Sequence, residues 1–72
     1  MVRHTMYADV AEALLACRST HELTLRDVAE QVGLSVTAVS NIERGVAKPR
    51  RSTRARLLEF LRERGYRVQE AA

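Results

Sequence analysis

The 72-residue sequence is long enough for one small domain and leaves no room for a second. Apolar residues make up 46% and charged residues 29%, which is typical of a soluble globular protein and argues against a disordered chain. No apolar run is long enough to span a membrane or to serve as a secretory signal. The single cysteine, Cys17, excludes an intramolecular disulfide, so we expect the reducing cytoplasm as the compartment.

The net charge of +3 is unevenly distributed along the chain. Residues 44–67 hold nine basic and two acidic side chains, whereas the remainder holds three basic and seven acidic ones. Between Arg44 and Arg56 there are six basic residues and no acid. A protein that binds a polyanion presents such a positive face, but a solvated basic surface that aids solubility has the same composition.

The first predicted helix covers residues 5–17. Thr5 is its expected N-cap, because a threonine hydroxyl can accept a hydrogen bond from a free amide at the helix start. Apolar residues recur at spacings of four, four and three and predict one buried stripe: Met6, Val10, Leu14 and Cys17.

Two short helices follow, joined by a turn of about three residues centred on Gly33. Thr24 as N-cap, with Asp27 three residues later, approximates a capping box. Gly33 ends this helix, since glycine adopts the left-handed conformation at least cost. Ser35 is the expected N-cap of the next helix, which Gly45 ends.

The spacing of small and apolar residues around this turn is typical of two helices that cross closely. Ala29 lies four residues before the turn glycine and is small enough for a close helix crossing. The predicted shared core consists of Val28, Val32, Leu34, Val39 and Ile42.

A loop at 45–51 contains the only proline, Pro49, and leads to a fourth helix with Ser52 as N-cap and Arg64 as its last residue. The predicted apolar face of that helix consists of Ala55, Leu57, Leu58, Phe60 and Leu61. Gly65 stops it, and Tyr66 and Val68 are expected to fold back onto the core or to form a short strand. We expect one domain over residues 1–72, with its core at about 5–67 and a tail at 68–72.

The segment TLRDVAEQVGLSVTAVS at 24–40 is similar to the DNA-binding headpiece of lactose-repressor-type regulators, as is the segment at 52–67. The stretch VSNIERG at 39–45, followed by Lys48 and Pro49, instead resembles the phage repressor and Cro (XRE-like) type. That second family also has a helix ahead of its helix-turn-helix. Both resemblances imply an all-α, compact domain of lambda-repressor-like architecture with four or five helices.

These resemblances imply sequence-specific binding of double-stranded DNA in the major groove by a phage or bacterial transcriptional regulator, most often a repressor. A homodimer is expected because one recognition helix reads few base pairs. The sequence has no effector-binding domain of the lactose-repressor type, so no small-molecule effector is expected. Leu25 stands where phage-type repressors often carry a glutamine, so that phosphate-clamping side chain is missing.

The helix at 36–44 is expected to read base edges, and by resemblance its reading residues are Val36, Thr37, Ser40, Asn41 and Arg44. Phosphate contacts are expected from two helix starts and the basic segment: Leu25 through its backbone amide, Ser35, Lys48, Arg50, Arg51 and Arg54. Glu43 is expected to pair with a nearby basic residue. Arg56, Arg62 and Arg64 are expected to form a solvated face or to pair with Glu59 and Glu63.

Enzyme chemistry and metal binding have little support in the sequence. His4, Cys17 and His21 are the only soft metal ligands, and Cys17 fits better as a small core residue. We therefore predict no enzyme activity, no cofactor and no metal. Two alternatives remain open: an antitoxin-like protein-interaction module on a helix-turn-helix scaffold, and a recombination accessory protein that binds DNA.

Overall fold

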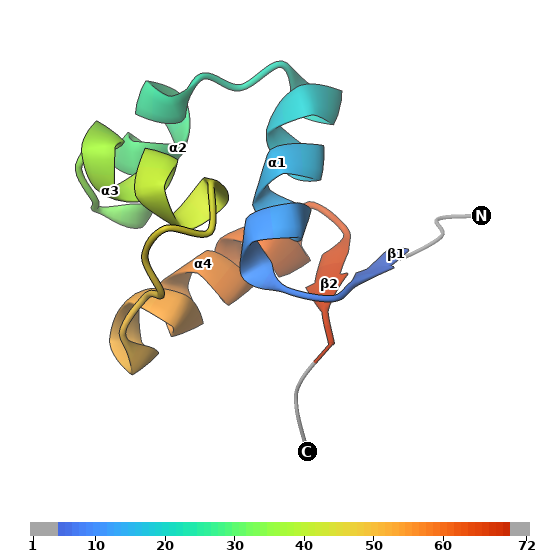
Figure 1. The fold of residues 1–72 in the computed structure, drawn as a ribbon. Helices are drawn as coiled ribbons and strands as arrows, with labels where there is room; N and C mark the ends of the chain where they lie inside the picture. The colour runs from blue at the N-terminus through green and yellow to red at the C-terminus, as the bar shows by residue number, and fades with distance from the viewer. Residues whose placement is uncertain (1–4, 70–72) are drawn as a thin grey trace.

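The computed structural model describes residues 5–69, in which four helices are flanked by two short strands (Figure 1). The elements in chain order are β1 (Thr5–Tyr7), α1 (Val10–His21), α2 (Leu25–Val32), α3 (Val36–Glu43), α4 (Arg51–Glu63) and β2 (Tyr66–Val68). This arrangement confirms the expected four-helix, helix-turn-helix fold class. His4 and the end of the expected tail at 70–72 lie outside the described residues.

The core lies where the four helices meet, and every helix contributes to it. It consists of twelve buried apolar residues: Val10, Ala13, Leu14, Cys17, Val28, Ala29, Val32, Val39, Ile42, Leu57, Phe60 and Leu61. No polar side chain of residues 6–69 is buried, so the packing is apolar throughout. Cys17 is fully buried, and burial raises the pKa of its thiol, with the charge of Arg64 acting in the opposite direction. The interpretation of Cys17 as a core residue is confirmed.

The α2–turn–α3 unit has the local structure that its sequence predicts. Thr24 and Asp27 form the capping box, with the Thr24 hydroxyl accepting from the Asp27 amide and the Asp27 carboxylate accepting from the Thr24 amide. Gly33 ends α2 in the left-handed conformation, with φ of 73°. Ser35 caps α3 by accepting a hydrogen bond from the Ala38 amide at 3.0 Å. These contacts fix the direction in which α3 leaves the turn.

The predicted first helix is shifted by four residues at both ends, since α1 extends to His21 and not to Cys17. Asp9, not Thr5, is the N-cap of α1, and its carboxylate accepts from the Glu12 amide at 2.9 Å. Residues 5–7 are extended instead, because they pair with β2 at the other end of the chain. Met6 is therefore not part of the buried stripe and is 60% exposed.

The two strands form a small parallel sheet that joins the two ends of the described chain. Thr5 pairs with Tyr66 and Tyr7 with Val68 in the strand register, and the Gln69 amide donates to the Tyr7 carbonyl at 2.7 Å. The rings of Tyr7 and Tyr66 stack at 5.7 Å between centroids. Of the two alternatives for Tyr66 and Val68, a strand packed against the core is confirmed.

The start and the apolar face of α4 also differ from the prediction. Arg50, not Ser52, is the N-cap, and it forms no side-chain capping hydrogen bond. Ala55 is exposed, because the buried positions Leu57, Phe60 and Leu61 define one side of the helix and Ala55 lies on the other. The N-terminal end of α4 is therefore an uncapped helix start in the basic part of the chain.

Candidate nucleic-acid interface

The outer side of α3 presents small and polar side chains while its inner side anchors the helix. Val39 and Ile42 are buried against the core. Val36, 38% exposed, and Thr37 face solvent, and Ser40 and Asn41 are half-buried. A helix with this slim outer face fits the width of a DNA major groove.

The helix is followed by a loop that is hydrogen-bonded back onto it. The amides of Val46 and Ala47 both donate to the carbonyl oxygen of Asn41, at 2.9 and 3.2 Å. The Gly45 amide donates to the Ile42 carbonyl at 3.1 Å, and Gly45 has a φ of 75° that favours glycine. The loop therefore keeps a fixed position relative to α3.

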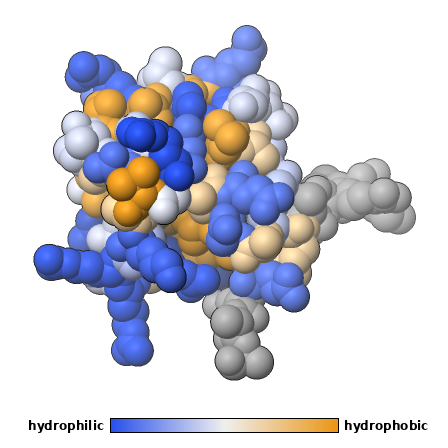
Figure 2. Space-filling model, in the orientation of Figure 1, coloured by the Kyte–Doolittle hydropathy of each residue, from blue (hydrophilic) through white to orange (hydrophobic). Residues whose placement is uncertain are grey.

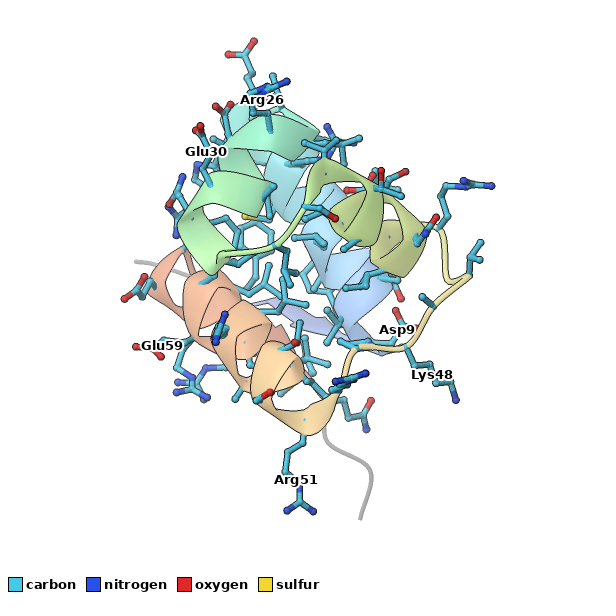
Figure 3. All side chains as sticks on the ribbon, turned by 90° about the vertical axis from the view of Figure 1, so that its left-hand side faces the viewer. Asp9, Arg26, Glu30, Lys48, Arg51 and Glu59 are labelled. Carbon is cyan, nitrogen blue, oxygen red and sulfur yellow. The ribbon has the colours of Figure 1, made fainter. Side chains whose placement is uncertain are left out.

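Basic side chains extend from this loop and from the start of α4. Arg44, Lys48, Arg50 and Arg51 are exposed and Arg54 is half-buried. Figure 3 shows Lys48 and Arg51 extending away from the body of the protein, and Figure 2 shows hydrophilic side chains projecting from this lower part of the molecule. The ion pairs found within residues 5–69 involve none of these five residues.

The first turn of α4 contains no acidic residue, and its N-cap supplies no side-chain acceptor. The first amides of a helix have no partner within the helix, and its dipole places partial positive charge at the same end. Here arginines stand beside that positive end, an arrangement that favours an anion. The sequence predicted the arginines but not the uncapped helix start, because Ser52 is the better capping residue by type.

The only acid on α3, Glu43, is paired with an arginine of α1. Its carboxylate accepts from Nε of Arg18 at 2.7 Å and from Nη2 at 2.8 Å, and Nη1 of Arg18 donates to the Leu23 carbonyl at 3.1 Å. The hydrogen bonds with Glu43 raise the pKa of the Arg18 guanidinium. The prediction that Glu43 pairs with a basic residue is confirmed, but its partner lies 25 positions away in the sequence.

Arg56 and Arg64, expected on a solvated face or in pairs with Glu59 and Glu63, also contact other parts of the protein. Nη1 of Arg56 donates to the Val32 carbonyl at 3.4 Å, near the end of α2. Arg64 lies over the Phe60 ring at 4.0 Å from the centroid and donates to the Phe60 carbonyl and to Gln31. Its expected pairing with Glu63 is present as a 3.9 Å contact. Part of the positive charge of α4 therefore belongs to arginines that make contacts within the protein.

The starts of α2 and α3 differ in whether an acidic side chain stands in the first turn. Leu25 packs partly against the core through its side chain, and its amide lies at the first position of α2. The pKa of Asp27 is lowered, first by its hydrogen bond from the Thr24 amide and then by that with the Thr24 hydroxyl. A carboxylate therefore already stands at the start of α2, whereas α3 has no acid in its first turn.

The comparisons with known proteins agree with this geometry. A family model described as a helix-turn-helix domain matches residues 9–72. The "HTH-type transcriptional regulator AglR" of Rhizobium meliloti (strain 1021) is 46% identical over 50 residues. That alignment covers 69% of this chain but only 14% of the relative. No solved structure matches the chain. No helix among the described residues is long and apolar enough to cross a membrane. The chain belongs to the helix-turn-helix domain family.

Proposed function

We propose that this chain binds double-stranded DNA sequence-specifically, with α3 in the major groove, and acts as a transcriptional regulator that represses by occupying an operator. The main support for this proposal is the composition of the surface formed by α3 and residues 44–54. Its outer face is small and polar, its flank is basic, and its one acid is neutralised by Arg18. In regulators with this motif the second helix of the helix-turn-helix enters the major groove.

Base reading is assigned to α3 and its C-cap. Thr37 and Asn41 carry donors and acceptors for base edges, and an asparagine amide suits adenine. Val36 packs on a thymine methyl group, since it is the exposed aliphatic side chain on α3. Ser40 and Arg44 lie one turn apart, and Arg44 reaches a guanine or a phosphate.

Phosphate contacts are assigned to positions on either side of the reading helix. The Leu25 amide and the Ser35 hydroxyl lie at the starts of α2 and α3. The remaining contacts come from the basic segment: Lys48, Arg50, Arg51 and Arg54. Such contacts determine affinity and register, whereas base contacts determine sequence preference.

We further propose a homodimer, because two recognition helices read more base pairs than one. A surface hollow of about 460 Å³ supports a contact through α4 and β2. It is lined by Met6, Leu58, Arg62, Tyr66, Arg67, Val68 and Gln69. None of these residues belongs to α3 or to residues 44–54. Because DNA is the proposed ligand, we place the protein in the cytoplasm of a prokaryotic cell or a phage-infected host.

The experiment that tests this function is selection of bound duplexes from a random library, using the purified 72-residue chain near physiological salt. An enriched inverted repeat, with half-sites about one helical turn apart, is the expected result. An enriched single half-site supports DNA reading by a monomer. No enrichment by a folded, helical protein contradicts sequence-specific binding and favours the protein-interaction alternative.

The same selection separates regulation from the recombination accessory function. Sites clustered beside recombination sequences, or bent on binding, favour the accessory function over promoter operators. The protein-interaction alternative gains less from the structure, because an interface with protein alone has no need for uncompensated positive charge at 44–54.

A further inference from the structure

Val46 has the most exposed large hydrophobic side chain in the described part of the chain. The residue is 65% exposed, compared with 60% for Met6, 49% for Leu15 and 38% for Val36. It follows α3 directly and lies between Arg44 and Lys48 in the sequence. Figure 2 shows hydrophobic atoms beside strongly hydrophilic ones over α3 and the loop after it.

The position of Val46 is fixed by its own backbone. Its amide donates to the Asn41 carbonyl at 2.9 Å, and the next amide, that of Ala47, donates to the same oxygen. Gly45 makes the required reversal with its φ of 75°. The backbone of Val46 is therefore fixed next to that of Asn41, a residue to which base reading is assigned.

We propose that Val46 is an apolar DNA-contact residue, which packs against the carbon surface of the duplex when α3 enters the major groove. This inference rests on the proposed function. The residues on either side, Arg44 and Lys48, are cations suited to phosphates, so the duplex comes close to the loop between them. The apolar groups available there are the thymine 5-methyl and the deoxyribose carbons. Contact with either group removes the apolar surface of the valine side chain from water.

The charge of the loop argues for DNA over a second copy of this chain at this position. The segment 44–51 carries four basic residues and no acid. A second copy of this loop would bring like charges together around Val46, which costs free energy. A DNA duplex, in contrast, can place phosphates against the basic side chains and apolar groups against Val46 in the same complex.

The test compares the affinity of native, Val46→Ala and Val46→Thr chains for a duplex enriched from the random library. Removal of two methyl groups from a contact is expected to weaken binding between about threefold and tenfold. Threonine keeps the shape but buries a hydroxyl, so it is expected to weaken binding as well. The slope of log affinity against log salt is expected to stay that of the native chain, because every phosphate contact is kept.

Leu15→Ala is the matched control, since it also truncates an exposed aliphatic side chain but lies on α1, outside the basic segment. Its affinity is expected to equal that of the native chain. Replacing each thymine of the duplex by uracil identifies the contacted group. A position where uracil abolishes the effect of Val46→Ala identifies a methyl contact, and an effect that persists throughout identifies deoxyribose.

Native affinity for Val46→Ala would overturn the inference, as would a weakened variant whose salt slope also changes. Failure of the native chain to enrich any duplex is a separate outcome, because it removes the proposed function before the valine variants are compared.

Discussion

Arg18 near the end of α1 and Glu43 at the end of α3 form a bidentate ion pair that fastens the proposed recognition helix to the first helix. Their side chains are 24% and 10% exposed, so the pair is neither fully buried nor freely solvated. The contact also places a guanidinium next to the single carboxylate of α3 and so neutralises its charge. This pair therefore links the stability of the domain to the charge of its interface.

Replacing Arg18 with methionine is expected to destabilise the fold by about 2 kcal/mol, between the values typical of exposed and buried pairs, because Glu43 keeps a poorly solvated charge. DNA affinity is expected to fall too, since an unpaired carboxylate then stands beside Arg44. Urea unfolding and a DNA titration measure the two effects. The Arg18→Met, Glu43→Met double variant is expected to recover most of both losses. A double variant no better than the single one would contradict this account.

The two turn glycines of the helix-turn-helix segment allow a paired test of backbone strain. Both have positive φ, but a Cβ at Gly33 would lie 3.2 Å from Nη1 of Arg56, whereas a Cβ at Gly45 would meet no described atom within 4 Å. Gly45→Ala is expected to cost about 1 kcal/mol from conformation alone, and Gly33→Ala about 2 kcal/mol. Thermal and urea unfolding measure both. Equal losses of stability would show that Arg56 moves aside without cost.

The capping box of α2 predicts a specific acid sensitivity. The pKa of Asp27 is lowered in the folded protein from its ordinary value of 3.8, so its contribution is present above that value and is lost as pH falls through the lowered pKa. Asp27→Asn is expected to flatten the decline of stability between about pH 5 and about pH 2. Urea midpoints measured across this range test it. A variant with the same decline as the native chain would assign the acid sensitivity to other carboxylates.

The arginines at the start of α4 are expected to contribute affinity without sequence preference. Replacing Arg50 and Arg51 by alanine should weaken binding to all duplexes alike and reduce the salt slope by about 0.9 for each phosphate that is no longer neutralised. Arg56→Ala is the control, because Arg56 is also exposed on α4 but donates to the Val32 carbonyl and is assigned no phosphate contact. An unchanged slope in the double variant would show that these two residues do not neutralise phosphates.

Asn41 is expected to read a base with its side chain while its carbonyl oxygen holds the following loop. Asn41→Ala leaves that carbonyl in place, so the loop geometry should survive the substitution. The variant is expected to lose about 1–3 kcal/mol of discrimination at one base pair only. Competition among duplexes that differ at single positions measures this. The same preferred sequence for both proteins would show that the side chain does not read bases.

The features that the sequence predicted well depend on residues close together in the chain. The Thr24–Asp27 capping box spans four residues, and the roles of Gly33 and Ser35 follow from the conformations that those residue types favour. The core of the helix-turn-helix follows from helical spacing. For the same reason the exposure of Val36 and Thr37 could be predicted before the structure.

The features that the sequence did not predict depend on residues that are far apart in the chain. Residues 5–7 are a strand because Tyr66 and its neighbours lie alongside, 61 positions further on, and no local pattern indicates this. The partner of Glu43 is equally remote. At the start of α4, serine is the better cap by residue type, yet the course of the chain after Pro49 begins the helix directly after Arg50. Within the candidate site, the exposure of Val46 depends on two amides that turn back to Asn41.

The pairing of β1 with β2 has a consequence for how this domain can be joined to other polypeptides. The sheet lies on the opposite side of α1 and α4 from α3, so the chain enters and leaves the described fold through this sheet, at opposite ends of the parallel pair and away from the proposed recognition face (Figure 1). A fusion partner joined on either side of the described fold would therefore leave α3 unobstructed. The connections to the rest of a longer polypeptide and the proposed DNA-binding surface therefore lie on different sides of the domain.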